Sequence, residues 1–305
     1  MKRVILVVAL CGIAVACGEN PAAPSAVTFP RNSGATSAWS PYLGLHAFNW
    51  EANIQQPHLV KLLDAGMVRG LRVDVNGPHI PSVVAWAQGH GVQDVLGIFG
   101  NEHLRSPNVV DHFDAVVAAN PAITHWEIGN EVELFIQMDV AEYMPVFMAL
   151  YEHAKVKHPE LVLIPHAPVG GGSSVDIIDG MMDQGILKLA NDPDINRRLQ
   201  VVSIHIYSFE SAFIYKVKRQ LQRLPATTEV WITETGLNAA DWSAHPEFVA
   251  TWYPRLRDLL RASRIYWYVF SECTNFSMVK GLSPTCPEPI AYSPLFTELT
   301  GSSSP

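Results

Sequence analysis

Two short stretches of this sequence each run through apolar residues and end in a carboxylate. The first is Trp126-Glu127-Ile128-Gly129-Asn130-Glu131-Val132-Glu133 and the second is Trp231-Ile232-Thr233-Glu234-Thr235-Gly236. Short apolar runs of this kind are typical of buried strands, so Glu131 and Glu234 are expected where two strands end. Cleavage of a glycosidic bond requires two carboxyl groups that flank that bond. The two stretches therefore predict glycoside hydrolysis.

The composition narrows the class of protein further. The chain has 305 residues, of which 48% are hydrophobic and 16% charged, as is typical of a well-packed soluble enzyme. Its net charge is -8, and no run of Lys and Arg interleaved with aromatic residues occurs in it. A nucleic-acid partner would normally require such a basic stripe. We therefore expect a small neutral substrate, no nucleic acid and no cofactor.

The N-terminus predicts export. Met1 to Arg3 is basic, residues 4–16 are apolar but too short to span a bilayer, and a small residue precedes Cys17. This stretch resembles a bacterial lipoprotein signal, which implies a signal peptide over residues 1–16 and acylation of Cys17. An ordinary secretory signal cut nearby is the alternative. Either way we expect a periplasmic or cell-surface protein that meets the membrane only through a lipid.

Cysteine usage agrees with an oxidising compartment. Cys11 lies in the signal and Cys17 would carry the lipid, so Cys273 and Cys286 remain as an even pair. We expect these two to form a disulfide, worth about 3 kcal/mol in the chain-entropy model. A metal site is the competing interpretation, but two thiolates without nearby His partners argue against it.

The rest of the chain divides into a tether and one domain. Residues 17–40 are rich in Ala, Pro, Ser, Asn and Gly without apolar periodicity, which predicts a flexible linker. From residue 41 to 305, short apolar runs alternate with amphipathic helical stretches, which indicates a parallel α/β sheet. A doubly wound sheet is the second possibility, but the stretch after the first apolar run, Gly44 to Asn49, is no Gly-rich phosphate turn.

Eight βα units fit into this domain, which is the size of a single (β/α)₈ barrel. The predicted strands cover residues 43–48, 70–75, 94–99, 124–129, 162–166, 201–206, 230–233 and 265–270. Predicted helices between or after them include residues 57–65, 108–119, 141–157, 212–223, 247–262 and 293–299.

Chemistry in such a barrel belongs at the C-terminal ends of the strands. Those ends carry Asn49, Trp50, Arg72, Asp74, Asn130, Glu131, His166, His205, Tyr207, Glu234 and Trp267. Sugars present flat apolar faces and a ring of hydroxyls, so aromatic platforms flanked by amides, carboxylates and imidazoles suit them. This set of strand ends therefore predicts a carbohydrate substrate.

The chain resembles glycoside hydrolase clan A, whose members are (β/α)₈ enzymes that cleave β-linked sugars with retention. Asn130-Glu131 after the fourth strand, His205 and Tyr207 after the sixth, and Glu234 after the seventh carry this resemblance. It implies that Glu131 is the general acid/base and Glu234 the nucleophile. It also implies that Asn130 binds the sugar 2-hydroxyl, Tyr207 donates to Glu234, Arg72 lies beside Glu234 and Trp267 forms the floor of the subsite. His46, His205 and Asn49 are further expected substrate contacts.

Other interpretations of these residues stay open. Arg72 could form a structural ion pair with Asp74 or another barrel carboxylate, and Glu127 is expected to be a paired interior residue. Many clan members have Pro after Asn-Glu, whereas Val132-Glu133 follows here. The run around Glu131 is similar to families 5, 39 and 79, which cover glucans, mannans, xylosides and glucuronides. The scarcity of long insertions favours an endo-acting enzyme with an open groove. We also expect a monomer.

Two alternatives belong to other functional classes. The first is a lipid-anchored barrel that binds glycans without chemistry, although both carboxylates, Asn130 and Tyr207 are present. The second is a metal-dependent hydrolase, suggested by the twelve histidines. That hydrolase would need His-x-His in the first strand, where only His46 occurs, so no metal site is expected.

Overall fold

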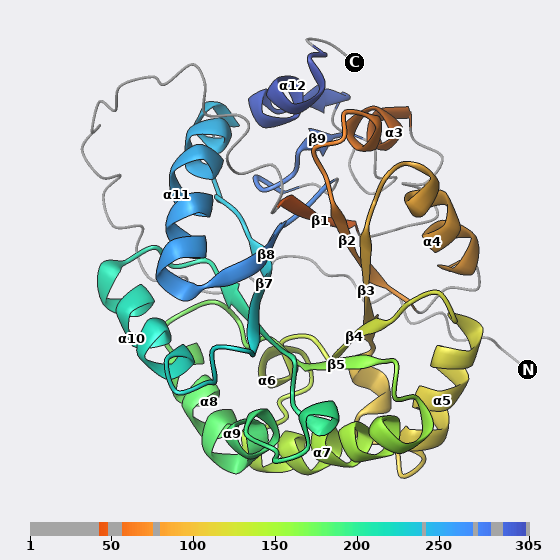
Figure 1. Ribbon diagram of the computed structural model, residues 1–305. Helices are drawn as coiled ribbons and strands as arrows, with labels where there is room; N and C mark the ends of the chain where they lie inside the picture. The colour runs from red at the N-terminus through yellow and green to blue at the C-terminus, as the bar shows by residue number, and fades with distance from the viewer. Residues whose placement is uncertain are drawn as a thin grey trace, which may run out of the picture. The chain divides into compact units, whose positions relative to one another are not determined.

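The computed structural model describes residues 43–47, 57–75, 80–239, 242–270, 274–281 and 289–302, which belong to one compact unit spanning residues 35–305. Eight parallel strands form a nearly closed barrel with helices around it, which confirms the predicted (β/α)₈ fold (Figure 1). The predicted signal, tether, Cys17, Asn49 and Cys273–Cys286 bridge lie outside the described residues and stay predictions.

The strands follow one another around the barrel in the order β5-β4-β3-β2-β1-β8-β7-β6. They are β1 (Leu43–Ala47), β2 (Gly70–Asp74), β3 (Asp94–Phe99), β4 (His125–Ile128), β5 (Val162–Pro165), β6 (Val201–Ile206), β7 (Glu229–Thr235) and β8 (Ala262–Trp267). A short antiparallel pair, β9 (Val279–Lys280) and β10 (Ala291–Tyr292), lies apart from this sheet.

The helices alternate with the strands along the chain. They are α3 (Pro57–Asp64), α4 (Ile80–Gly89), α5 (Val109–Ala119), α6 (Val132–Phe135), α7 (Val140–Lys157), α8 (Ser174–Met181), α9 (Leu187–Ala190), α10 (Ser211–Leu221), α11 (His245–Leu260) and α12 (Pro294–Thr300). Among the described residues, no helix combines the length and apolar character needed to cross a membrane.

Helix α7 shows how the sequence fixes an element that supports the site. The Asp139 carboxylate caps its first turn by accepting from the Glu142 backbone N–H at 2.9 Å. One turn further, the buried Tyr143 hydroxyl donates to the Ile128 carbonyl and accepts from the His166 N–H, both at 2.8 Å. This single side chain therefore holds the ends of β4 and β5 in register.

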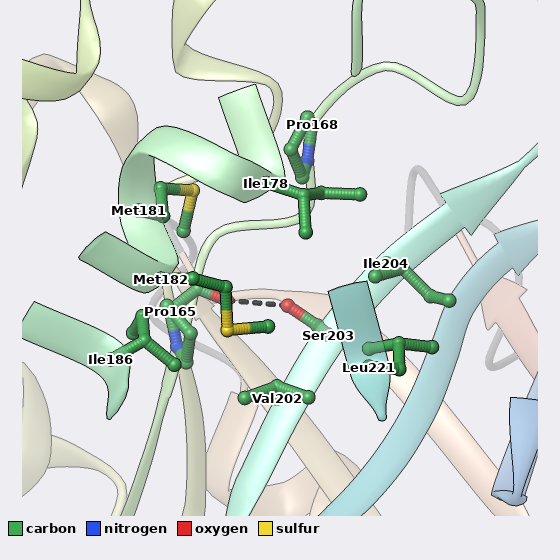
Figure 2. Close-up of a pocket in the computed structure, with 10 residues that line it drawn as sticks. All are labelled: Pro165, Pro168, Ile178, Met181, Met182, Ile186, Val202, Ser203, Ile204 and Leu221. Carbon is green, nitrogen blue, oxygen red and sulfur yellow. Dashed lines mark hydrogen bonds between the residues drawn. The ribbon is translucent and has the colours of Figure 1, made fainter. Parts of the chain in front are cut away.

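The barrel has a seam between β5 and β6, which share no backbone ladder within the described residues. Pro165 lacks an N–H and cannot donate to a neighbouring strand. The Ser203 hydroxyl of β6 donates instead to the Pro165 carbonyl (Figure 2). The pocket drawn there has a volume of about 20 Å³ and an apolar lining, so it has room for about one water molecule and none for a sugar.

Large side chains fill the interior at the end of the barrel where the strands begin. Tyr266 of β8 lies fully buried across the barrel, and a Cβ at Gly44 or Gly70 would come within 2.4 or 3.1 Å of it. Two glycines on neighbouring strands therefore make room for one ring. Leu96, Ile164, Val201 and Trp231 complete this plug. These side chains close the barrel interior at the N-terminal ends of the strands, so a site inside the barrel must lie at their C-terminal ends.

Strand β7 carries a β-bulge at Thr233, directly before Glu234. Ile204 of β6 pairs with Ile232, but the next β6 residue, His205, pairs with Glu234, so Thr233 is the extra residue. A bulge breaks the strict alternation of side chains between the two faces. Both Thr233 and Glu234 consequently reach barrel residues, as their hydrogen bonds to Glu127 and Arg72 demonstrate.

Candidate active site

A tight turn after β4 presents Glu131. Gly129 has φ 84°, in the region that favours glycine, and a Cβ there would lie 2.7 Å from Val132 Cγ1. The Asn101 side chain then holds Asn130 from both sides, donating to its carbonyl and accepting from its N–H, each at 2.7 Å. Glu131 itself has φ 43° and ψ 50°, an uncommon left-handed conformation for a residue with a side chain.

The carboxylates of Glu131 and Glu234 lie close together and are largely buried. His205 Nδ1 is 2.7 Å from Glu131 Oε1 and 3.7 Å from Glu234 Oε2. One ligand atom from each of these three residues lies within 4.8 Å of the other two. Glu131 is 7% exposed and Glu234 is 4% exposed. The predicted pair therefore meets across the barrel mouth with an imidazole beside both.

Arg72, fully buried on β2, is the hub of this cluster. Its Nε donates to Glu127 Oε2 at 2.7 Å, its Nη1 to Glu234 Oε1 at 2.5 Å and its Nη2 to Asn130 Oδ1 at 2.6 Å. Nη1 also lies 2.9 Å from His46 Nδ1, which is in turn 3.3 Å from Glu234 Oε1. The planar guanidinium thus fixes residues from three other parts of the barrel.

Tyr207 provides the second donor to Glu234. Its hydroxyl donates to Glu234 Oε2 at 2.7 Å. The Tyr207 N–H donates to the Gly170 carbonyl at 3.2 Å, and a Cβ on Gly170 would lie 2.7 Å from the Tyr207 nitrogen. Only glycine therefore lets the loop after β5 approach β6 closely enough to hold Tyr207. Each oxygen of Glu234 has its own donor.

The two carboxylates differ in their electrostatic surroundings. Burial alone would raise the pKa of Glu234, but the charge of His205, the charge of Arg72 and the contact with His46 hold it well below its usual range. Burial, and then the charge of Arg72, lowers the pKa of His46 to about 4, so His46 is neutral near pH 7.

His205 behaves in the opposite way. Burial works against its charged form, yet the charge of Glu234 and the bond to Glu131 outweigh burial and raise the pKa of His205. Glu131 and His205 are thus a contact pair able to hold a proton between Oε1 and Nδ1. Glu234 accepts from Arg72 and Tyr207 and lies near His205, and these groups favour its ionised form.

The structure does not bring Trp267 to this cluster. Trp267 is fully buried, its indole N–H donates to the Phe276 carbonyl at 2.8 Å, and its ring packs against His245 and Phe248 of α11. Side chains alternate along a strand, so Tyr266 faces the barrel and Trp267 faces the helices. The expected aromatic floor is therefore not Trp267.

Tyr268, which the sequence analysis missed, lies beside this cluster instead. Its ring lies 5.6 Å from the His46 ring and 6.2 Å from the Tyr207 ring, edge to face in both cases. The peptide bond from Tyr268 to Val269 is cis. The signal that could have found it is the strand boundary, because β8 ends at Trp267 rather than at residue 270.

Other open interpretations are resolved by the contacts. Glu127 is fully buried and accepts from Arg72 and from Thr233 Oγ1 at 2.9 Å, so it is the paired interior residue that was expected. Arg72 therefore has both roles that the sequence allowed, an ion pair with a barrel carboxylate and a contact to Glu234. Glu133 is also partly buried, and its Oε1 accepts from the Val169 N–H at 2.6 Å.

Two groups of described residues have donor atoms close enough to hold a cation. Glu131, His205 and Glu234 form one, and Asp114, His153 and His158 form the other on the outside of the barrel. In the outer group Lys157 also binds Asp114, and its charge opposes a cation there. In the inner group the donors already bond to one another and to Arg72. Neither group needs an ion to satisfy its charges.

Comparison with known proteins supports the fold. No family model and no curated protein matches the sequence. Among solved structures, a β-mannanase of Thermomonospora fusca in complex with mannohexaose has a TM-score of 0.54 and 18% identity over 81% of this chain and 86% of that chain. A hyperthermophilic endo-β-1,4-glucanase in complex with substrate has a TM-score of 0.55 and 13% identity over 88% and 99%. A GH128 exo-β-1,3-glucanase of Aureobasidium namibiae has a TM-score of 0.50 and 10% identity over 75% and 84%.

Proposed function

We propose that this protein is a retaining glycoside hydrolase that cleaves β-linked poly- or oligosaccharides, with Glu234 as nucleophile and Glu131 as general acid/base. The observation that carries the proposal is the short distance between two carboxylates in unequal surroundings. Oxygens within 4.8 Å fit the separation of about 5 to 5.5 Å between carboxyl groups in retaining enzymes. Inverting enzymes need about 6.5 to 9.5 Å to admit a water.

In the first step a Glu234 oxygen attacks the anomeric carbon and the glycosidic carbon–oxygen bond breaks. The leaving oxygen takes a proton from Glu131, which His205 holds in place through its Nδ1. Arg72 and Tyr207 keep Glu234 ionised and oriented until the glycosyl-enzyme forms. In the second step Glu131 removes a proton from water, the water oxygen bonds to the anomeric carbon, and Glu234 leaves as a carboxylate.

The remaining cluster residues have supporting roles in this proposal. Asn130, fixed by Arg72 and Asn101, is placed to contact the sugar 2-hydroxyl, a bond that strengthens in the transition state. Tyr268 takes the platform role first expected of Trp267, because it lies beside His46 and Tyr207. We infer endo action on a glucan or mannan, since one structural neighbour is named as an endo-β-1,4-glucanase and another as a β-mannanase.

The test is turnover of β-glucans, mannans, xylans and galactans by wild type and by Glu234→Gln. Product release by wild type, with retained anomeric configuration in the NMR spectrum of the fresh product, supports the proposal. Glu234→Gln is expected to bind the same glycan without releasing product. Binding without release in both proteins would instead favour a non-catalytic glycan-binding barrel. Inversion of configuration would overturn the roles given to the two glutamates.

From sequence alone we also propose export, a lipid on Cys17 and a Cys273–Cys286 disulfide. Mass spectrometry of the protein recovered from a bacterial membrane fraction tests the first two, since acylation adds a fixed mass to the peptide that begins at Cys17. Thermal melts with and without reductant test the third, with a lower melting temperature expected on reduction. A Cys17→Ala protein that stays in the membrane fraction would contradict the anchor.

A further inference from the structure

Helix α6 exposes two large apolar side chains beside Glu131. Leu134 is 40% and Phe135 is 56% exposed. The other large hydrophobic residues that are exposed in the described part of the chain are Val156, Ile195, Tyr215 and Ile290, none of them adjacent to another. Single exposed hydrophobic residues are ordinary, whereas exposed apolar side chains that lie together more often mark a ligand or partner site.

The backbone around this pair is held firmly. At the end of α6 the Arg105 guanidinium donates to the Ile136 carbonyl at 2.8 Å and pairs with Glu142 through Nε at 2.7 Å. At its start, Val132 is buried and Glu133 accepts from the Val169 N–H. The short helix therefore has one face anchored to the barrel and presents Leu134 and Phe135 on the other. A platform fixed in advance binds with less loss of entropy than a mobile loop.

The position of α6 relative to Glu131 indicates what the platform meets. Figure 1 shows α6 inside the ring of outer helices, next to β4 and β5. Glu131 is its N-cap residue, and the Phe135 N–H donates to the Glu131 carbonyl at 3.0 Å. Phe135 thus lies one helical turn, about 5.4 Å, beyond the proposed acid. The acid must contact the oxygen of the leaving group, so the part of the substrate next to α6 is the leaving group.

We infer that Leu134 and Phe135 form a binding subsite for the leaving-group side of the substrate, and that this side is a sugar whose apolar face stacks on Phe135. This inference rests on the proposed function. It adds that the protein binds the saccharide chain on the leaving-group side of the cleaved bond. An apolar CH face suits an aromatic ring, and no described charged residue other than Glu133 lies within α6 itself. A substrate with a charged or very small leaving group gains nothing from this subsite.

The experiment compares two substrates that carry the same transferred glycosyl unit but different leaving groups. One is the saccharide polymer that wild type cleaves best, and the other is the β-glycosyl fluoride, whose leaving group is fluoride and cannot contact α6. For Phe135→Ala, kcat/KM on the polymer is expected to fall about tenfold, because roughly one aromatic contact is lost. On the fluoride, kcat/KM is expected to match wild type. Phe135→Trp should retain the polymer activity.

A second readout follows the glycosyl-enzyme directly. With the fluoride as donor and added oligosaccharide as acceptor, Phe135→Ala should transfer less glycosyl to acceptor and more to water. Tyr215→Ala is the matched control. Tyr215 lies on α10 and is 63% exposed, so this substitution removes an exposed ring away from α6. Equal polymer activity and equal transfer in Phe135→Ala and wild type would overturn the subsite. Absence of fluoride hydrolysis by wild type would instead refute the proposed function.

Discussion

Replacement of Arg72 by methionine should lower the free energy of unfolding of this barrel substantially. Arg72 is fully buried and lies between two buried carboxylates, Glu127 at 2.7 Å and Glu234 at 2.5 Å. Methionine keeps the unbranched apolar stem of Arg72 but not its guanidinium, so the main effect is loss of the cation and its donors. Glu127 and Glu234 then keep their hydroxyl donors, Thr233 and Tyr207, but lose the guanidinium that neutralises them in a buried interior.

The size of the effect follows from those contacts. Removing one partner from a buried, hydrogen-bonded ion pair typically costs about 3–5 kcal/mol. A natural domain has a total stability of about 5–15 kcal/mol, so Arg72→Met should lose a large share of it at pH 7. Arg264→Met is the matched control, because Arg264 pairs with Asp94 at 2.8 Å but is 34% exposed. That partly exposed ion pair should contribute about 0–1 kcal/mol.

The effect of pH on this difference has a definite sign. The pKa of Glu234 in the folded protein is held well below its usual range, partly by Arg72. A carboxylate with a lowered pKa stabilises the fold fully above its unfolded pKa of about 4.3, and this stabilisation is lost gradually as the pH falls from there through the folded pKa. Protonation relieves the unpaired charge in Arg72→Met. The gap between wild type and variant should therefore narrow from pH 7 to pH 4.

Urea unfolding at pH 7 and pH 4 measures both quantities through the midpoint and slope. Arg72→Lys serves if the methionine variant does not fold, since lysine keeps the charge but not the fork of donors. A loss below about 1 kcal/mol at pH 7, comparable to the Arg264→Met control, would refute the reasoning. A gap that widens toward pH 4 would refute its electrostatic origin.

Three further predictions concern neighbours of the glutamates. Tyr207→Phe removes a hydrogen bond to an ionised carboxylate, worth about 1.5–3 kcal/mol, so kcat/KM should fall about 10- to 100-fold, and unchanged kinetics would exclude a role for that bond. The pKa of His205 is raised in the folded state, so its stabilisation is present below the unfolded pKa of about 6.5 and is lost as the pH rises through the folded value. His205→Gln should therefore lower the melting temperature more at pH 6 than at pH 9, and the reverse order would contradict the shift. In Gly129→Ala the new Cβ would lie at a residue with positive φ and 2.7 Å from Val132. Gly66→Ala is the control, because φ there is 71° but nothing lies within 4 Å of the new Cβ. Gly129→Ala should therefore lower the melting temperature more than Gly66→Ala, and equal effects would mean that Val132 moves away at little cost.

Much of the fold could be predicted from local sequence. Apolar runs that alternate with amphipathic stretches gave all eight strands, most within two residues of their observed bounds. Parallel strands in a barrel place their C-terminal ends on one face, so the residues after those runs had to meet. Glu131, Glu234, Arg72, His46, His205 and Tyr207 came together for this reason.

Side-chain direction was less accessible, because it depends on where a strand begins. β8 starts at Ala262 and ends at Trp267, so the alternation turns Trp267 toward α11 and leaves Tyr268 beside the site. A shift of one residue reverses every side chain of a strand. The same sensitivity applies to β7, where the bulge at Thr233 gives Glu234 its orientation.

The sequence by itself determined the architecture and the two carboxylates, because periodicity and strand-end residues are local properties of the chain. Only the tertiary structure decided which groups surround each carboxylate. Arg72 contacts residues up to 162 positions away, and Glu131 meets His205 across 74 positions. The unequal electrostatics of the two glutamates are produced by these long-range contacts. Charge environments depend on three-dimensional distance and burial, and neither can be read from spacing along the chain.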